Sequence, residues 1–349
     1  LITGKKKTNF LGVVITYPEK SKTQSHIIKF SSIHKAAEGK KLRTGVIGAG
    51  IYAKSVFLPN IKKNHRTDLT GIVSAKGLNA QQSAKKFGLS FAGTLSDDIL
   101  KDKKIDLVAI LTRHRDHGNL VLDGLQAGKH IYCEKPLALK KSQIDKIAKE
   151  LKKKEHPYLT VGFNRRFAPY SKKIQSFLEG RSEPLFAHYR VNAGYIPGTH
   201  WLHDPEIGGG RLIGEGCHFI DYLIFLVGQT PKTVHTIGLP NNGIYTNDNF
   251  QVTITFPDGS LGTLAYLSNG SKSLSKEYLE VFCAGKSVIL DDYRRLEFYD
   301  ASTRKERARF AQDKGHAFAW NNFVDTILDG GSPPISYQEI IHTAYATLA

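Results

Sequence analysis

A lysine that follows an apolar segment is the first residue with clear chemical potential. Lys135 lies in the segment AGKHIYCEKPLAL, residues 127–139, between Glu134 and Pro136. Lysine is rarely buried without a partner, and its ammonium group is a compact hydrogen-bond donor. If the preceding residues form a parallel strand, Lys135 would stand at its carboxyl end, in the crevice where open α/β sheets bind ligands. The alternative is a lysine at a strand exit that only meets solvent.

A histidine near a predicted helix start is the second candidate. His218 lies in GGGRLIGEGCHFIDYLIFLVG, residues 208–228. The small residues Gly214, Gly216 and Cys217 just before it would leave room for a ligand beside the start of the helix. A histidine in such a place can act as a general base. It can equally be a structural histidine on a packed helix.

A polar loop precedes this helix. The stretch HWLHDPE, residues 200–206, offers Trp201 as a stacking face and His203 as a polar contact for a sugar. An ordinary surface loop is the alternative interpretation.

A glycine turn predicts the cofactor. Residues 45–55, GVIGAGIYAKS, place Gly48, Gly50 and Ala53 in a GxGxxA pattern between a predicted strand and a predicted helix. The first glycine permits the tight turn, the second lets the backbone approach a pyrophosphate, and Ala53 allows close helix packing. The helix N-terminus then offers unpaired N–H groups to the phosphates. This context indicates dinucleotide binding.

The next predicted strand bears on the choice between NAD and NADP. A carboxylate for the ribose 2′-hydroxyl is usual about 20 residues after the glycine turn, but this sequence has Ser74 there and Lys76 two residues later. A missing carboxylate and a nearby cation favour NADP slightly over NAD. A solvated loop lysine is the alternative for Lys76.

The elements that position these residues follow a regular order. Strands are predicted at 42–47, 69–75, 105–111 and 130–134, and helices that end at Gly88 and Gly128 lie between them. Strands that alternate with helices predict a doubly wound parallel sheet. After Tyr158 the pattern changes to strand-like runs at 185–195, 247–256, 259–268, 277–285 and 286–292, with a helix at 215–226 and two helices at the C-terminus. This part is expected to be α+β with a large, mainly antiparallel sheet.

The pattern also predicts a division of the chain. We expect residues 1–40 to be an N-terminal extension or linker, residues 41–163 a Rossmann domain, and residues 164–349 a domain for substrate binding and oligomerisation.

Composition excludes several classes of protein. The 349 residues carry a net charge of +17, but the lysines are scattered without interleaved aromatics, so we expect no nucleic-acid binding and consider an anionic small ligand. No apolar run is long enough for a membrane span, and no secretory segment is visible, so no membrane association and a cytoplasmic setting are expected. The three cysteines are far apart and suggest reduced thiols rather than a disulfide framework or a metal site.

Four segments together resemble one family. GVIGAG, AGKHIYCEKPLAL, VGFNRRFAP and GGGRLIGEGCHFID are similar to the glucose-fructose oxidoreductase and inositol dehydrogenase family, Gfo/Idh/MocA, from Leu42 to the C-terminus. The resemblance implies a Rossmann domain, a C-terminal domain with an open sheet, a nicotinamide cofactor and a sugar or cyclitol substrate. It also implies homodimers or homotetramers built through that sheet. In this family the lysine at Lys135 contacts the reacting hydroxyl, and the histidine at His218 is a candidate for proton transfer.

The sequence departs from the family pattern at two places. Many members carry an aspartate four residues before the histidine, but this chain has Gly214, followed by Glu215. The TPN-like turn expected after the strand at 105–111 is altered to Thr112-Arg113-His114, with His117 further on. Arg113 could contact an anionic group or only cap the helix. Residues 10–18, FLGVVITYP, resemble more weakly the end of a medium-chain, zinc-type dehydrogenase, which would make this chain the C-terminal module of a fusion.

The predicted function is an NAD(P)-dependent oxidoreductase that moves hydride between the nicotinamide and a carbinol carbon of a sugar-like substrate. Lys135 would polarise the substrate oxygen and His218 would accept its proton. A non-catalytic NAD(P)-binding sensor and a redox-neutral NAD-dependent glycosidase are the alternatives. The predicted cofactor contacts are Gly48, Gly50, Ile51, Tyr52, Ser74, Lys76, Thr112, Arg113, His117, Glu134, Lys135, Asn164 and Arg165, and the predicted substrate contacts are Tyr195, Trp201, His203 and Glu215.

Overall fold

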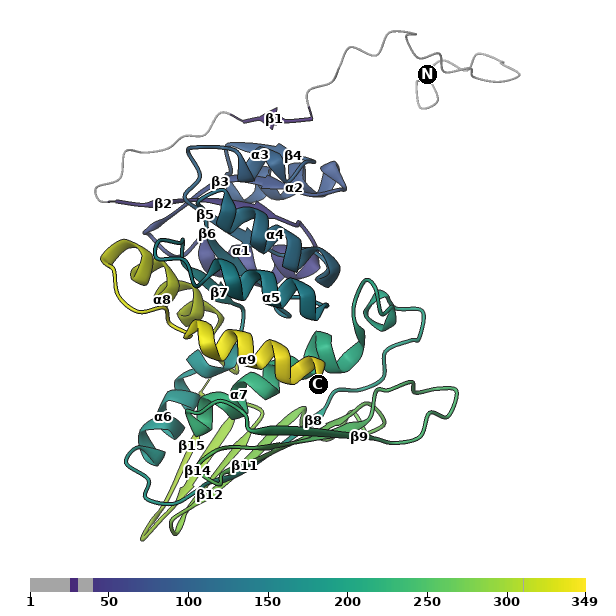
Figure 1. The fold of residues 1–349 in the computed structure, drawn as a ribbon, viewed down its shortest axis with the longest axis vertical. Helices are drawn as coiled ribbons and strands as arrows, with labels where there is room; N and C mark the ends of the chain where they lie inside the picture. The colour runs from purple at the N-terminus through teal and green to yellow at the C-terminus, as the bar shows by residue number, and fades with distance from the viewer. Residues whose placement is uncertain (1–25, 31–39, 310) are drawn as a thin grey trace, which may run out of the picture.

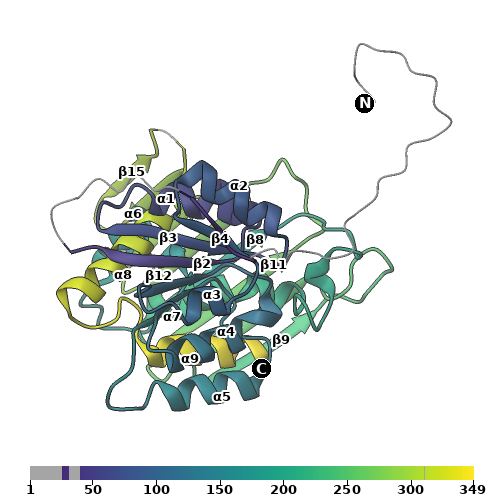
Figure 2. The same cartoon turned by 90° about the horizontal axis from the view of Figure 1, so that it is seen from above.

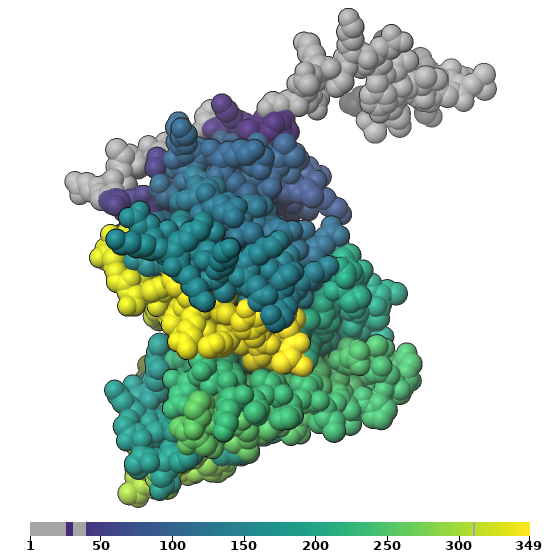
Figure 3. All heavy atoms as spheres, in the orientation of Figure 1, coloured from purple at the N-terminus to yellow at the C-terminus, as the bar shows by residue number. Residues whose placement is uncertain are grey.

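Two β-sheets with helices between and around them form the structure, a computed structural model that describes residues 26–30, 40–309 and 311–349 (Figure 1). The first sheet lies in the N-terminal half and the second in the C-terminal half. The helices near the C-terminus lie between them, so that the last part of the chain returns toward the first sheet (Figure 3).

The first sheet is the predicted doubly wound parallel sheet. Its order is β1-β4-β3-β2-β5-β6-β7, and every neighbouring pair is parallel except β1 with β4. The chain runs from β2 outward in one direction to β3 and β4, and then crosses to β5, β6 and β7 on the other side. The strands are β1 (Ile28–Lys29), β2 (Leu42–Ile47), β3 (Thr67–Val73), β4 (Phe91–Gly93), β5 (Leu107–Ile110), β6 (His130–Cys133) and β7 (Leu159–Val161).

Helices cover this sheet on both faces. They are η1 (Ala53–Phe57), a π-helical turn that continues into α1 (Leu58–Ile61), then α2 (Gly77–Phe87), α3 (Asp97–Leu100), α4 (His114–Gln126) and α5 (Lys141–Glu150). Helix α2 ends at Gly88, whose φ of 80° is left-handed, and Gly128 adopts a φ of 74° just after α4. Both predicted glycine stops are therefore confirmed.

The second sheet is larger and mainly antiparallel, as predicted. Its order is β15-β14-β13-β12-β8-β11-β10-β9, and β8 and β11 are the one parallel pair among the described strands of this sheet. The strands are β8 (Phe186–Asn192), β9 (Thr233–Gly238), β10 (Phe250–Thr255), β11 (Leu261–Leu267), β12 (Glu277–Cys283), β13 (Lys286–Asp291), β14 (Arg295–Tyr299) and β15 (Thr303–Arg307). The helices between β7 and β9 are η2 (Asn164–Phe167), α6 (Pro169–Leu178), η3 (Trp201–His203), η4 (Leu212–Gly216) and α7 (Cys217–Val227).

The two closing helices pack toward the first half of the chain. In α8 (His316–Asp329), Trp320 and Phe323 join the core that Phe57 and Tyr132 form on the first sheet, and α9 (Tyr337–Leu348) packs against α5 and α7. Figure 2 shows α9 and α5 side by side. The predicted boundary at residue 163 remains a prediction, and the chain after it is not confined to the second sheet.

The predicted N-terminal extension is described only in part. Residues 26–30 contain β1, which pairs antiparallel with β4 and adds an edge strand to the first sheet. The segment 10–18, on which the resemblance to a zinc-type dehydrogenase depends, lies outside the described residues.

Candidate active site at the edge of the first sheet

The carboxyl ends of four neighbouring parallel strands bring the predicted cofactor residues to one edge. Gly48 follows β2, Ser74 follows β3, Thr112 comes shortly after β5, and Lys135 comes shortly after β6. The strand order reverses between β2 and β5, and at such a switch point an open α/β sheet forms its ligand-binding crevice.

The glycine turn fits a dinucleotide. Gly48 has a φ of 111°, and a Cβ added there would lie 2.5 Å from the carbonyl oxygen of Leu111, so the close approach of β2 and β5 requires glycine. A Cβ added at Gly50 would meet no atom within 4 Å, so open space adjoins that backbone. Ile51 next to it is 87% exposed, whereas the side chain of Tyr52 is half-buried. This open cradle before a helix suits a pyrophosphate.

The end of β3 offers no carboxylate to a ribose. Ser74 is half-buried, and its N–H donates to the carbonyl of Gly93 at 3.1 Å. Lys76 is exposed at the first residue before α2. Residues 74–76 therefore carry a cation and no carboxylate at the position expected for the 2′ substituent.

Lys135 connects the two halves of the chain. Its Nζ atom donates to the carbonyl oxygen of Gly214, in η4, at 2.7 Å, and its side chain is half-buried. The peptide bond between Lys135 and Pro136 is cis, which agrees with the turn expected from the sequence. The ammonium group thus lies beside the segment that leads to His218.

The carboxyl group of Glu134 is buried beside the backbone of Lys135. Its Oε2 accepts from the backbone N–H of Lys135 at 3.3 Å, and the nearby Tyr52 hydroxyl acts to lower the pKa of the carboxyl group. Its Oε1 is buried without a hydrogen-bond partner among the described residues. Burial raises the pKa of Glu134 and outweighs the nearby charge of Lys135. A Cβ at Gly162 would lie 2.7 Å from Oε1, so that glycine makes room for the carboxyl group.

His218 stands at the start of α7 as an uncharged imidazole. Burial lowers its pKa well below the ordinary value of 6.5, and the charges of Arg165 and Lys135 lower it further. Its Nδ1 is buried without a partner among the described residues, and its ring meets that of Phe163 edge-on at 6.3 Å. A neutral imidazole close to Lys135 can accept a proton.

The altered turn after β5 separates into residues with different roles. His117 is buried, with Nδ1 2.7 Å from the carbonyl oxygen of Pro136 and Nε2 3.2 Å from that of Thr112. It therefore connects the Thr112 turn with the Lys135 turn, and both of its nitrogens already face protein groups. Arg113 is exposed, and its guanidinium lies 5.5 Å from the ring centre of Trp201. Thr112 is half-buried at the crevice.

His114 is a site residue that the sequence analysis did not select. It is 7% exposed, its Nδ1 lies 2.7 Å from the carbonyl oxygen of Gly208, and its ring meets Trp201 edge-on at 4.9 Å. Burial, followed by the charge of Lys135, lowers its pKa to about 3. Its position two residues after Thr112 was the available signal, since residues just after a parallel strand line the crevice.

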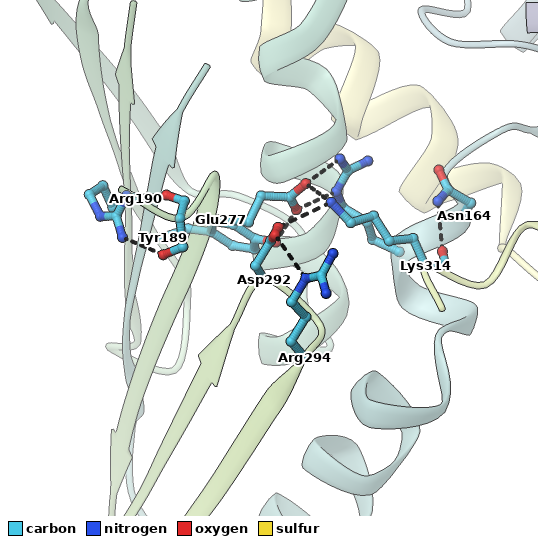
Figure 4. Close-up of polar contacts among 9 residues, drawn as sticks. Asn164, Tyr189, Arg190, Glu277, Asp292, Arg294 and Lys314 are labelled. Carbon is cyan, nitrogen blue, oxygen red and sulfur yellow. Dashed lines mark hydrogen bonds and ion pairs between the residues drawn. The ribbon is translucent and has the colours of Figure 1, made fainter. Parts of the chain in front are cut away.

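Asn164 and Arg165 are occupied by protein partners rather than directed freely into the crevice. Asn164 donates through Nδ2 to the carbonyl oxygen of Lys314 at 2.6 Å, and Arg165 pairs with Glu277 through two bonds of 2.8 Å. Glu277 also accepts from Tyr189 at 2.8 Å and from Lys314 at 2.6 Å. Figure 4 shows Glu277 facing Lys314, with Asn164 beyond it. Cofactor contact by these two residues stays a prediction.

The predicted substrate residues lie in different surroundings. Trp201 and His203 belong to η3, which lies over the Thr112 turn, while Tyr195 is 48% exposed and contacts the ring of Tyr245. The Nδ1 of His203 lies 3.4 Å from Oδ1 of Asp248.

Glu215 is held by two other side chains. Its Oε2 lies 2.8 Å from Nε of Arg211 and accepts from the hydroxyl of Tyr266. Burial alone would raise the pKa of Glu215, but the charges of Arg211 and Lys135 outweigh it and lower that pKa. Substrate contact by Glu215 stays a prediction.

Two properties of the described residues bear on other classes of function. No group of three or more His, Cys, Asp or Glu side chains in them is arranged to hold a metal ion. No helix in the described part of the chain is long and apolar enough to cross a membrane.

Comparison with known proteins decides the family. Residues 42–163 match the oxidoreductase family with an NAD-binding Rossmann fold, and residues 183–322 match the C-terminal alpha/beta domain of the same family, GFO_IDH_MocA. The chain belongs to this family. It is an NAD(P)-dependent oxidoreductase, as the sequence predicted, whereas the matches give no support to the suggested fusion with a zinc-type dehydrogenase.

Relatives of this family member share much of its length. Myo-inositol 2-dehydrogenase of Thermotoga maritima is 25% identical over 72% of this chain and 76% of its own length. An uncharacterized oxidoreductase of Bacillus subtilis, YrbE, is 25% identical over 82% of this chain and 83% of its own. The solved structure of levoglucosan dehydrogenase in complex with NADH and levoglucosan has a TM-score of 0.78 at 21% identity, over 88% of this chain and 95% of that one, and therefore shares the fold.

Proposed function

We propose that this oxidoreductase acts on a carbinol carbon of a sugar or cyclitol, with Lys135 and His218 as its catalytic residues. The observation that carries the proposal is the 2.7 Å bond from the Lys135 ammonium to the Gly214 carbonyl. It holds a hydrogen-bond donor at the carboxyl edge of the first sheet, next to the segment that positions His218. The myo-inositol dehydrogenase of Thermotoga maritima supports a polyol as the substrate class.

The cofactor supplies the hydride acceptor when it is bound, and the residues that would hold it are those of the glycine turn, Ser74 and Lys76. Lys135 donates a hydrogen bond to the substrate hydroxyl oxygen, which favours the alkoxide character that develops as the carbinol is oxidised. The ammonium is already fixed at a backbone carbonyl, so less side-chain freedom is lost when substrate binds.

His218 accepts the hydroxyl proton. Its lowered pKa keeps the imidazole neutral near neutral pH, which is the form that a proton acceptor requires. The nearby charges that lower this pKa also favour release of the proton after the reaction. General-base assistance of this kind contributes about 10²- to 10⁴-fold to the rate.

The substrate would lie between the first sheet and the η3 loop. Trp201 offers an aromatic face there, as sugar-binding sites use. The net charge of +17 favours an anionic derivative such as a uronate or sugar phosphate over a neutral one, through general attraction.

We also propose that the protein is a homodimer or homotetramer through the second sheet. Phe186 and Phe282 are 39% and 45% exposed on neighbouring strands, and their rings lie 6.4 Å apart. An exposed aromatic pair of this kind favours contact with another subunit. Light scattering after size-exclusion chromatography tests it, and a monomer at all concentrations would contradict it.

The function is tested by titrating the purified protein with NADH and NADPH and by assaying oxidation of myo-inositol, levoglucosan, glucuronate and glucose 6-phosphate. Binding of a reduced cofactor and turnover of at least one of these polyols are expected. Cofactor binding without any turnover would favour a non-catalytic sensor. A tightly held cofactor that never exchanges, with glycoside cleavage, would favour a redox-neutral glycosidase.

A further inference from the structure

The His114 imidazole occupies the space that a side chain at residue 214 would need. A Cβ added at Gly214 would lie 2.9 Å from Cε1 of His114 and 2.5 Å from Cδ1 of Leu202. No side chain fits at residue 214 while these two keep their positions. The imidazole from the start of α4 therefore fills the place where a side chain of η4 would otherwise stand.

The hydrogen bonds of His114 fix its tautomer. Nδ1 lies 2.7 Å from the carbonyl oxygen of Gly208, and a carbonyl oxygen can only accept, so Nδ1 carries the proton. The low pKa of the buried ring keeps it neutral at physiological pH. In a neutral imidazole with a proton on Nδ1, Nε2 is a hydrogen-bond acceptor.

No hydrogen bond to Nε2 of His114 is found among the described residues, although Nδ1 is bonded and the ring is 7% exposed. Nε2 is covalently bonded to Cε1, the atom of this ring that would lie nearest to a Cβ at residue 214, and the carbonyl of residue 214 accepts from the ammonium of Lys135. An unpaired acceptor thus adjoins the group that holds the Lys135 donor.

We propose that His114 is a specificity-determining residue whose Nε2 accepts a hydrogen bond from a second hydroxyl of the substrate, next to the one that Lys135 contacts. This inference rests on the proposed function. It names the substrate class more closely: a vicinal diol, of which one hydroxyl meets the lysine and its neighbour donates to the histidine. A substrate without the second hydroxyl makes no hydrogen bond to Nε2, so its binding lacks that interaction.

Neighbouring residues fix the position of the His114 imidazole. The backbone N–H of Arg115 donates to the carbonyl of Ile207 at 3.1 Å, close to the Gly208 carbonyl that fixes Nδ1. Trp201 packs on the ring edge at 4.9 Å. The loop of residues 201–208 and the start of α4 therefore position the imidazole together.

Two substitutions of His114 test the contributions of its Nδ1 and Nε2 atoms separately. In His114→Asn the shorter amide reaches the position of Nδ1 and keeps the bond to Gly208, but it provides nothing at Nε2. In His114→Gln the longer side chain places its amide near Nε2. His65→Asn is the matched control, because His65 lies exposed in the loop before β3.

The first readout needs no substrate. Nitrogen-15 spectra of the imidazoles, with the His114 signals assigned by their loss in His114→Asn, should show the Nδ1–H tautomer without titration between about pH 5 and 9. An Nε2–H tautomer, or protonation in that range, would overturn the inference.

The second readout is kinetic, with myo-inositol, levoglucosan and glucuronate as probes. His114→Asn should lower kcat/KM about five- to tenfold, mainly through KM, while His114→Gln retains more activity and both bind NADH and NADPH like the unchanged protein. Equal activity of His114→Asn and the unchanged protein would overturn the role of His114 alone. If the unchanged protein oxidises none of the probes, the proposed function itself is overturned, and the substrate contact of His114 with it.

Discussion

Arg165 and Glu277 form a buried, two-pronged ion pair, in which Nε and Nη2 of the guanidinium each lie 2.8 Å from a carboxylate oxygen. Arg165 lies in η2, just after β7 of the first sheet, whereas Glu277 begins β12 in the second sheet. Oε1 of Glu277 also accepts a hydrogen bond of 2.6 Å from Nζ of Lys314, which lies just before α8. The pair therefore joins the crevice side of the molecule to the second sheet and to the returning C-terminal helices.

Replacing Glu277 with glutamine should destabilise the protein. The substitution leaves the buried charge of Arg165 without its counter-ion, and loss of one partner of such a pair costs about 3–5 kcal/mol in the free energy of unfolding. Urea unfolding measures the change, with Glu280→Gln on the same strand as the control. Equal stability of the two variants would contradict the role given to the pair.

The pH dependence of unfolding gives a separate prediction. Burial alone would raise the pKa of Glu277, but Arg165 and Lys314 outweigh it and hold that pKa far below its ordinary value of 4.5. A group with a lowered pKa in the folded state contributes fully above the ordinary value and loses its contribution as the pH falls further. Below about pH 4.5 the unfolding free energy of the unchanged protein should therefore fall more steeply than that of Glu277→Gln.

Lys135→Ala should abolish most turnover and leave cofactor affinity intact. The variant removes the donor to the substrate oxygen but not the glycine turn, and a loss of about 10²- to 10⁴-fold in kcat is expected for a group of this kind. Steady-state kinetics and NADH titration measure the two effects. Lys146→Ala, an exposed lysine on α5, is the control. Unchanged turnover would remove Lys135 from the mechanism.

The local parts of this arrangement could be predicted from sequence. The glycine turn, the alternating strands and the position of Lys135 after β6 follow from residue types over short stretches. Arg165 and Glu277 are 112 residues apart in the sequence. Their pairing depends on how η2 packs against the second sheet, so no local sequence pattern predicts it. His114 had a local signal in its position just after β5, but its contact with Gly208 and its place beside Gly214 could not be predicted, for the same reason.

Arg165 shows why residue type alone is insufficient. The motif VGFNRRF placed Asn164 and Arg165 in the crevice by resemblance, and their position after β7 is consistent with that placement. Their polar atoms, however, are bonded to Lys314 and Glu277. A buried guanidinium requires a counter-charge, and only the folded structure identifies which carboxylate provides it.

His218→Asn should lower kcat by about 10²- to 10⁴-fold and change the pH profile. Because the pKa of His218 is well below 6.5, the unchanged protein should keep a constant kcat from about pH 6 to 8 and lose activity only in acid, as the imidazole becomes protonated. Residual activity of His218→Asn should lack that acidic limb. An activity loss centred near pH 6.5 in the unchanged protein would contradict the neutral imidazole.

Lys76→Ala should separate the two cofactors. The exposed ammonium before α2 can meet the 2′-phosphate of NADPH but has no comparable partner on NADH, so the dissociation constant of NADPH alone should rise several-fold, about 1 kcal/mol for an exposed charge pair. Lys86→Ala, near the other end of α2, is the control. An equal effect on NADH and NADPH would show that Lys76 does not select the cofactor.

Alanine at the two glycines of the turn should have opposite consequences. Gly48→Ala forces a side chain into a left-handed backbone with a φ of 111° and within 2.5 Å of the Leu111 carbonyl, so it should lower the unfolding free energy by about 1–3 kcal/mol or more. Gly50→Ala meets no protein atom within 4 Å, so its stability should stay close to that of the unchanged protein. Its methyl group instead enters the space proposed for the pyrophosphate, and the dissociation constant of NADH should rise at least about tenfold, or about 1.4 kcal/mol. Urea unfolding and NADH titration of both variants measure these effects, and a Gly50→Ala protein that binds NADH normally would show that the cofactor does not approach this turn.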